Sequence, residues 1–194
     1  MNRYVITVLM AALAVLSSGC FLNVTSHRQP DGSLVYAGEV YNEGAPLSSP
    51  SVEGTFFDAA GNVITTRTAP VCTVLPSKSV SAFRVSLPPG IQDPARVEWK
   101  LLGDEVADAY VATGLSATVT NIVPEGGVVD MSSVYGEIRN DSDRQYRGAS
   151  LCIGWANDKG EILDVGYGFG AGWRLDPGGV MPFEVQIDNI PEDA

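Results

Sequence analysis

The chain has 194 residues, of which 45% are hydrophobic and 18% are charged, and its formal net charge is −11. Such an acidic surface repels nucleic acid, whose binding depends on neutralising phosphates with Lys and Arg. We therefore expect no nucleic-acid partner. One histidine and three cysteines cannot supply the His and Cys clusters that zinc sites need, so we expect no metal centre of that kind.

The N-terminus reads as a signal peptide. A short basic start ending at Arg3 precedes an apolar run from Tyr4 to Leu16. The run is shorter than the roughly 20 residues that span a bilayer in a helix, and it has the length of a signal-peptide core. It ends in LSSGC, residues 16–20, and small residues before a cysteine resemble the lipobox of bacterial lipoproteins.

The resemblance implies that residues 1–19 are removed and that Cys20 is lipidated. The alternative is an ordinary secretory signal with an incidental cysteine. Removal takes away Arg3 alone and moves the net charge from −11 to −12, so anionic lipid heads would repel the surface. We expect the acyl chains to make the membrane contact. The expected location is the extracytoplasmic side of the bacterial cell envelope, at the outer membrane if the organism has one.

The rest of the chain repeats itself in three ordered blocks. They are YAGEVYN and VYGEIRN (from residues 36 and 134), FFDAAGNVI and WANDKGEIL (from 56 and 155), and VSAFRVSL and VMPFEVQI (from 80 and 180). Leu75 and Leu175 share the register of the last pair. Ordered blocks with shared glycines indicate a duplication. We predict one copy over residues 20–103, a linker over 104–115 and a second copy over 116–194.

Each copy is predicted to consist of β-strands. Apolar and polar residues alternate in the blocks, which is the period of a half-buried strand. Gly61 and Gly160 suit hairpin turns that need a positive φ. Short strands with turn signals about every 8–12 residues predict an all-β fold of two tandem Ig-like antiparallel β-sandwiches.

The two copies differ after their last shared block. After Leu87 the first copy continues into ARVEWKLL, residues 95–102, which reads as a closing strand, whereas DNIPEDA follows Ile187. Either the chain is truncated or the second copy lacks an edge strand, and a bare edge would invite pairing with another chain. The segment from Tyr110 to Thr120 is an alternative filler of that gap.

The order of these motifs resembles the FxLYD domain. The resemblance rests on GEV-x-N, then an aromatic–aromatic–Asp turn with Gly, then L-P and AF-x-V. It covers most of the chain after residue 19, once per copy, and IGWAN (residues 153–157) makes the second copy the weaker match. That family consists of small Ig-like β-sandwich modules, often in bacterial lipoproteins and other envelope proteins. The resemblance implies no catalytic residues, so we expect a protein that is not an enzyme and that uses no cofactor.

Isolated polar residues give weak signals. His27 is expected to be a solvated loop residue, because a hydrolase needs a nucleophile, a base and an orienting group together. NDSDR, residues 140–144, could offer oxygen ligands to calcium but lacks the spacing of an EF-hand loop, and a turn is favoured. Glu39 and Glu137 recur between the copies and are expected on solvated strand faces or in local backbone bonds.

Cys72 and Cys152 occupy non-equivalent places in the two copies. Disulfides are permitted outside the cytoplasm. We favour unpaired thiols. The alternative is a Cys72–Cys152 disulfide that links the two copies, which requires the Cα atoms of these residues to approach within about 7 Å.

The stretch GYGFGAGW, residues 166–173, alternates glycine with aromatic residues. Counting back from Leu175 places Tyr167, Phe169 and Trp173 on the face of that core leucine, so we favour these rings as core and the glycines as outward-facing. A bulge would reverse this and expose the rings as a ligand-binding surface.

Two classes of function follow. The first is a lipid-anchored, non-enzymatic envelope protein whose modules bind a partner protein or act as a spacer. The second is a carbohydrate-binding surface lipoprotein that uses the aromatic residues of the second copy, since sugars stack on exposed rings.

Overall fold

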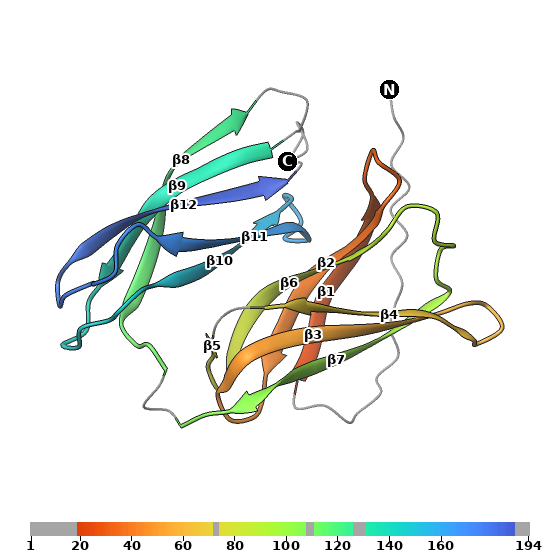
Figure 1. The fold of residues 1–194 in the computed structure, drawn as a ribbon, viewed down its shortest axis with the longest axis horizontal. Helices are drawn as coiled ribbons and strands as arrows, with labels where there is room; N and C mark the ends of the chain where they lie inside the picture. Colours follow the sequence, from red (N-terminus) through yellow and green to blue (C-terminus); the bar gives the residue numbers. More distant parts are fainter. Residues whose placement is uncertain (1–18, 72–73, 108–110, 126–130, 189–194) are drawn as a thin grey trace.

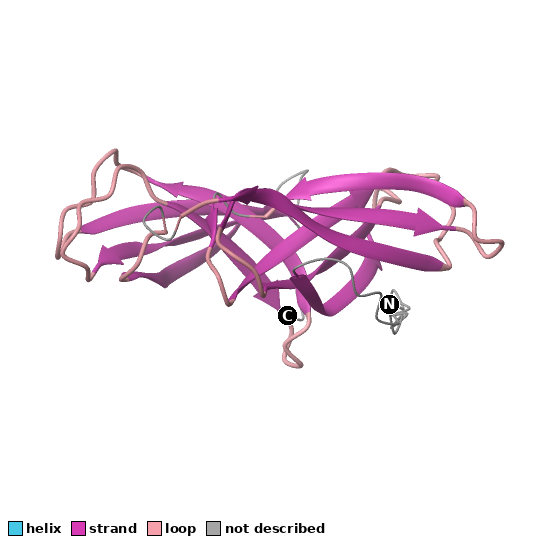
Figure 2. Ribbon diagram, turned by 90° about the horizontal axis from the view of Figure 1, so that it is seen from below, coloured by secondary structure: helices cyan, strands magenta, loops and turns pink. Residues whose placement is uncertain are grey.

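The computed structural model describes residues 19–71, 74–107, 111–125 and 131–188 (Figure 1). These residues form strands and turns and no helix, as Figure 2 shows, which confirms the all-β fold class. The strands are β1 (Gly19–Arg28), β2 (Leu34–Asn42), β3 (Leu47–Phe57), β4 (Val63–Pro70), β5 (Val74–Leu75), β6 (Ser79–Leu87), β7 (Arg96–Glu105), β8 (Leu115–Glu125), β9 (Met131–Asn140), β10 (Ser150–Ala156), β11 (Ile162–Gly170) and β12 (Val180–Asp188).

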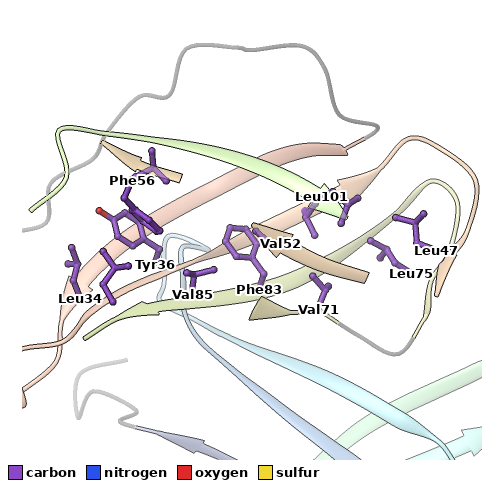
Figure 3. Close-up of a cluster of buried hydrophobic side chains, with 13 residues drawn as sticks. Leu34, Tyr36, Leu47, Val52, Phe56, Val71, Leu75, Phe83, Val85 and Leu101 are labelled. Atoms are coloured by element: carbon purple, nitrogen blue, oxygen red, sulfur yellow. The ribbon is translucent and has the colours of Figure 1, made fainter. Parts of the chain in front are cut away.

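The first copy has two antiparallel sheets with a core between them. One sheet has the order β1-β2-β6, and in the other β3 pairs with β4, β5 and β7. The core contains side chains from both sheets, among them Tyr36 and Phe83 from the first and Val52, Phe56 and Leu101 from the second (Figure 3). Alternate residues of β2 and β3 face this core, as the period of two in the sequence predicts.

Trp99 of β7 packs against one side of the first core. Its ring centroid lies 5.3 Å from that of Phe83, 5.7 Å from those of Tyr36 and Phe56, and 6.2 Å from that of Phe21. Edge-to-face and tilted arrangements of this kind are the preferred geometries of aromatic pairs. Strand β7 therefore links the two sheets at one side of the core, since Phe21 belongs to β1 and Phe56 to β3.

The second copy has two fewer strands than the first among the described residues, because neither β5 nor β7 has a counterpart strand there. Its strands form one five-stranded sheet with the order β10-β11-β12-β9-β8. The order β8-β9-β12 corresponds to β1-β2-β6, and the hairpin β10-β11 corresponds to β3-β4. Strands β11 and β12 are joined only through Phe169↔Glu184 and Gly170↔Phe183, at one end of β11.

A buried asparagine ends the second strand of each copy in the same way. The side-chain nitrogen of Asn42 donates to the carbonyl oxygen of Leu75 at 3.3 Å, and that of Asn140 donates to the carbonyl oxygen of Leu175 at 3.2 Å. Both asparagines have 0% exposure. Their side-chain oxygens each accept from the backbone N–H two residues on, at 3.0 Å. The repeated sequence therefore encodes a repeated hydrogen-bond pattern.

The predicted hairpin turns also recur. Gly61 and Gly160 have φ of 86° and 77°, which confirms the left-handed backbone expected at both positions. Asp58 and Asn157 cap these turns, because each side-chain oxygen accepts from backbone N–H groups two and four residues later. The repeated sequence blocks therefore share their turn chemistry.

The first strand of the second copy lies in a segment for which the sequence allowed two interpretations: the beginning of the second copy, or a replacement for its closing strand. Residues 115–125 form β8, which pairs antiparallel with β9 and corresponds to β1. The idea that the segment from Tyr110 to Thr120 replaces the closing strand is therefore wrong for its described part from Leu115 on. Those residues form the first strand of the second copy.

The two copies pack against each other through side chains. No strand of one copy pairs with a strand of the other in the described part of the chain. Strand β11 lies against β1, β2 and β6, and an apolar cluster joins Ala37, Ala82, Ile162 and Val165. The hydroxyl of Thr25 also donates to the carbonyl oxygen of Ile162 at 2.8 Å.

Candidate functional site

The expected lipidation site lies within the first strand. Cys20 is half-buried in β1 opposite Tyr41, and it is a free cysteine. Residues 1–18, which carry most of the expected signal peptide, lie outside the described residues. Within the described residues, no helix has the length and apolar character to cross a membrane. An acyl group on Cys20 would therefore attach directly to a strand of the first sheet.

The aromatic residues of β11 and the turn after it are exposed. Trp173 is 91% exposed, Phe169 is 74% exposed and Tyr167 is 40% exposed. The expectation that these rings fill the core is wrong, and the alternative of exposed rings holds.

The glycines of β11 face the interior instead. A Cβ added at Gly168 would lie 2.3 Å from Cγ2 of Val185, and one at Gly166 would lie 2.5 Å from Cγ1 of the same residue. The missing side chains let β11 approach β12 closely, which is a known reason for glycine within a strand. The alternation of glycine and aromatic residues therefore has a structural cause. Glycine is needed on the face of β11 that packs against β12, and the aromatic rings lie on the exposed face.

Tyr167 is tied to the first copy. Its hydroxyl donates to the carbonyl oxygen of Pro70 at 2.8 Å. Burial raises the pKa of Tyr167 to about 12, with Asp164 adding to the rise and Arg84 opposing it. The side chain is 40% exposed, and its hydroxyl bonds the first copy across the seam, by which we mean the contact of β11 with β1, β2 and β6 and the residues around it. Tyr167 is thus a structural contact as well as a surface ring.

Phe169 and Trp173 have exposed side chains on a bonded backbone. Phe169 lies opposite Ser150 on β10 and opposite Glu184 on β12. The carbonyl oxygen of Trp173 accepts from the N–H of Gly148 at 3.1 Å. The backbone beneath both rings is therefore fixed while the rings face solvent. Two large exposed rings held in this way form a candidate binding surface, which we call the aromatic surface.

The cysteines depart from expectation at one position. Cys152 is disulfide-bonded, so the preference for an unpaired thiol is wrong there. Cys72 lies outside the described residues. The Sγ atom of Cys152 lies 3.3 Å from the carbonyl oxygen of Val71. Cys152 therefore sits at the seam, beside the residue that precedes Cys72.

His27 is not a solvated loop residue. It lies in β1 opposite Val35 and is half-buried. Burial lowers the pKa of His27, and the positive charge of Arg84 lowers it further. The structure brings no nucleophile to it among the contacts described: its Nε2 lies 3.3 Å from the side-chain nitrogen of Gln29.

The acidic candidates have local roles. In the segment 140–144, Asn140 is buried and Asp141 pairs with Arg139 at 2.7 Å, so the turn interpretation fits the geometry. Glu39 accepts a hydrogen bond from the side chain of Asn23 at 2.9 Å, and Glu137 is exposed. The described residues contain no group of three or more His, Cys, Asp or Glu that could hold a metal ion.

A cleft lies beside β10 at the seam. Its volume is about 780 Å³. The lining includes Leu151 and Gly154 of β10, Leu115 of β8, and Val80 and Ala82 of β6. The sequence left open whether the chain is truncated or the second copy lacks an edge strand. Among the described residues, β10 borders this cleft, whose lining also includes polar residues such as Ser81 and Arg147.

Comparison with known proteins gives no relative: no family model, no curated protein and no solved structure matches the chain.

Proposed function

We propose that this chain is a lipid-anchored protein of the bacterial cell envelope whose tandem Ig-like modules bind a partner or hold other components apart, without catalysis. The signal peptide over residues 1–19 and the acyl anchor on Cys20 are parts of this proposal. The observation that supports it best is the packing between the copies. The apolar cluster and a buried pair between Arg84 and Asp164, whose Nε and Oδ1 are 3.0 Å apart, join them.

The position of Cys20 gives this packing a functional meaning. Strand β1 contains Cys20 and also contacts β11 of the second copy. An acyl anchor would therefore attach to the same sheet on which the second copy is packed. A partner bound by the second copy would be held at a set distance and orientation from the membrane, which suits a presenting or spacing role.

The anchor is tested by growing cells with labelled palmitate. The wild-type chain should take up the label, and the Cys20→Ser variant should not. Absence of label from the wild type, or equal label in the variant, would contradict lipid anchoring at Cys20. Partner binding is tested separately by cross-linking and capture of the lipidated protein from its own envelope. A specific protein retained by the wild type supports the proposal, and none in repeated captures contradicts it.

A second candidate is carbohydrate binding at the aromatic surface. The exposure of Phe169 and Trp173 favours it, because sugars stack their apolar C–H faces on exposed rings. Soluble glycans should then change the tryptophan fluorescence of the wild type. The Trp173→Ala variant should lose the response while keeping its unfolding midpoint. No response to any glycan in the panel would exclude this candidate.

A further inference from the structure

The first copy shows how its second sheet is closed. Strand β7 pairs antiparallel with β3 along most of its length, from Leu47↔Glu105 to Phe57↔Arg96. Val97, Trp99 and Leu101 alternate along β7, and all three belong to the core or pack against it. The first copy thus covers the free edge of β3 and the side of its core with one amphipathic strand.

The second copy has no such strand among its described residues. Strand β10 corresponds to β3, and β11 is its only described sheet neighbour. Across the core, Val119 and Ile122 of β8 lie opposite Gly136 and Val134 of β9, which places them on the inner face. They are nevertheless 47% and 39% exposed. Apolar side chains on an inner face are left uncovered where the first copy has β7.

Trp155 gives an independent sign of the same gap. It corresponds to Phe56, whose ring contacts Trp99 of β7 edge-on at 5.7 Å. In the second copy, the indole nitrogen of Trp155 is buried without a hydrogen-bond partner among the described residues. A buried donor without a partner destabilises the fold, so an acceptor is expected beside it. A backbone carbonyl of an added strand would supply one.

We propose that the second copy accepts an extended strand from a partner protein, which pairs with the free edge of β10 as β7 pairs with β3. This inference rests on the proposed binding function and names the class of partner. Strand addition to a sheet edge is an established mode of recognition, in which backbone hydrogen bonds give affinity and pockets for alternate side chains give specificity. The cleft beside β10 lies at this edge.

The sister strand also defines the occupant. By analogy with β7, the occupant is a segment with apolar side chains at alternate positions and a large ring near its centre, as at Val97, Trp99 and Leu101. A second copy of this chain is disfavoured, because two acidic chains, each of formal net charge −12 without residues 1–19, repel each other. The occupant is therefore a neutral or basic segment of another protein.

The direct test uses a labelled peptide with the sequence of residues 95–102 and the purified full-length chain. Fluorescence anisotropy should show saturable binding, and hydrogen exchange should slow at β10. A control peptide with V97S, W99S and L101S should not bind. Absence of binding by the first peptide, or protection at β3 instead of β10, would overturn the proposal, since β3 protection means exchange with the chain's own β7.

Matched variants of β8 test the inner face. Replacing both Val119 and Ile122 by Thr should weaken peptide binding about tenfold, which corresponds to about 1.4 kcal/mol. Val123→Thr is the control, because Val123 is also 39% exposed but lies opposite Ser133 on the other face. Equal affinity in all variants would contradict the proposal. A partner captured from the envelope equally by wild type and by the double variant would keep the binding function and refute strand acceptance.

Discussion

Arg84 of β6 and Asp164 of β11 form an ion pair across the two copies. Nε and Oδ1 are 3.0 Å apart, and the side chains are 24% and 4% exposed. The pair lies beside the cluster of Ala37, Ala82, Ile162 and Val165, so it is removed from water on one side of each charge. Electrostatics and apolar packing therefore act at the same seam.

Removing one partner of this pair should be costly. Asp164→Ala leaves the Arg84 charge in a largely dry seam, and the free energy of unfolding should fall by about 3–5 kcal/mol. Urea denaturation measures the change. Arg139→Ala is the matched control, because Arg139 and Asp141 are each more than half exposed and should contribute less than about 1 kcal/mol. Similar losses in the two variants would contradict a buried pair.

The two repeated asparagines should be equivalent in energy. Asn42→Ala and Asn140→Ala each leave buried backbone carbonyls without their donor, and each should cost about 1–3 kcal/mol. Chemical denaturation checks both. Asn121→Ala, at an exposed position of β8, should change stability by less than about 0.5 kcal/mol. A neutral Asn140→Ala would show that the second copy does not depend on this pattern.

The reversed faces of β11 can be tested with two substitutions. Gly168→Ala forces a Cβ to within 2.9 Å of the Glu184 carbonyl oxygen, and overpacking of this kind costs about 1–3 kcal/mol. Trp173→Ala should be nearly neutral, because that side chain is 91% exposed. Thermal unfolding distinguishes them. The opposite ranking would restore the interpretation of the rings as core.

The sequence predicted the all-β fold and the hairpin turns because these depend on local period and turn chemistry. It misplaced the aromatic residues for an identifiable reason. The copies are offset by 99 residues at Gly61 and Gly160 but by 100 at Leu75 and Leu175, so the second copy has one extra residue in between. One residue reverses the face of a strand. Strand β11 also ends at Gly170, before Leu175. The alternation of inner and outer faces therefore cannot be counted back from Leu175 along one continuous strand.

The seam could not be predicted, because no local sequence pattern indicates which residues of the two copies contact each other. Ala37 and Val35 are fully buried on the side of β2 that faces away from the first core, where alternation would predict solvent. The polar partners are equally long-range: Arg84 and Asp164 are brought together only by the packing of the copies. His27 was misjudged for the same reason, since its burial comes from that side of β1.

Acidification should weaken the fold through His27. Its pKa is lowered below the ordinary value of 6.5, so the folded state binds the proton less readily than the unfolded state. The stability is fully present above 6.5 and falls as the pH drops from 6.5 through the folded pKa. Unfolding midpoints of the wild type between about pH 7.5 and 5 should decline more than those of His27→Gln. Parallel profiles would contradict this.

The seam disulfide should join Cys152 to Cys72. Val71, the residue before Cys72, already contacts the Sγ of Cys152 at 3.3 Å. Peptide mapping without reduction should yield one cross-linked peptide that contains both cysteines and disappears on reduction. Cys152→Ser should lower the unfolding midpoint of the oxidised protein, because a bridge over a long loop stabilises by about 2–4 kcal/mol. Unlinked peptides would refute this pairing.

The most direct test of the open edge in the second copy is to close it. Residues 88–105 of the first copy are placed after Ile187, where they would follow β12 as they follow β6. The unfolding midpoint should rise by at least about 4 °C, and hydrogen exchange should slow in β10. The same graft with V97S, W99S and L101S should give no rise. An unchanged or lower midpoint with the intact graft would contradict an open edge at β10 in the described part of the second copy.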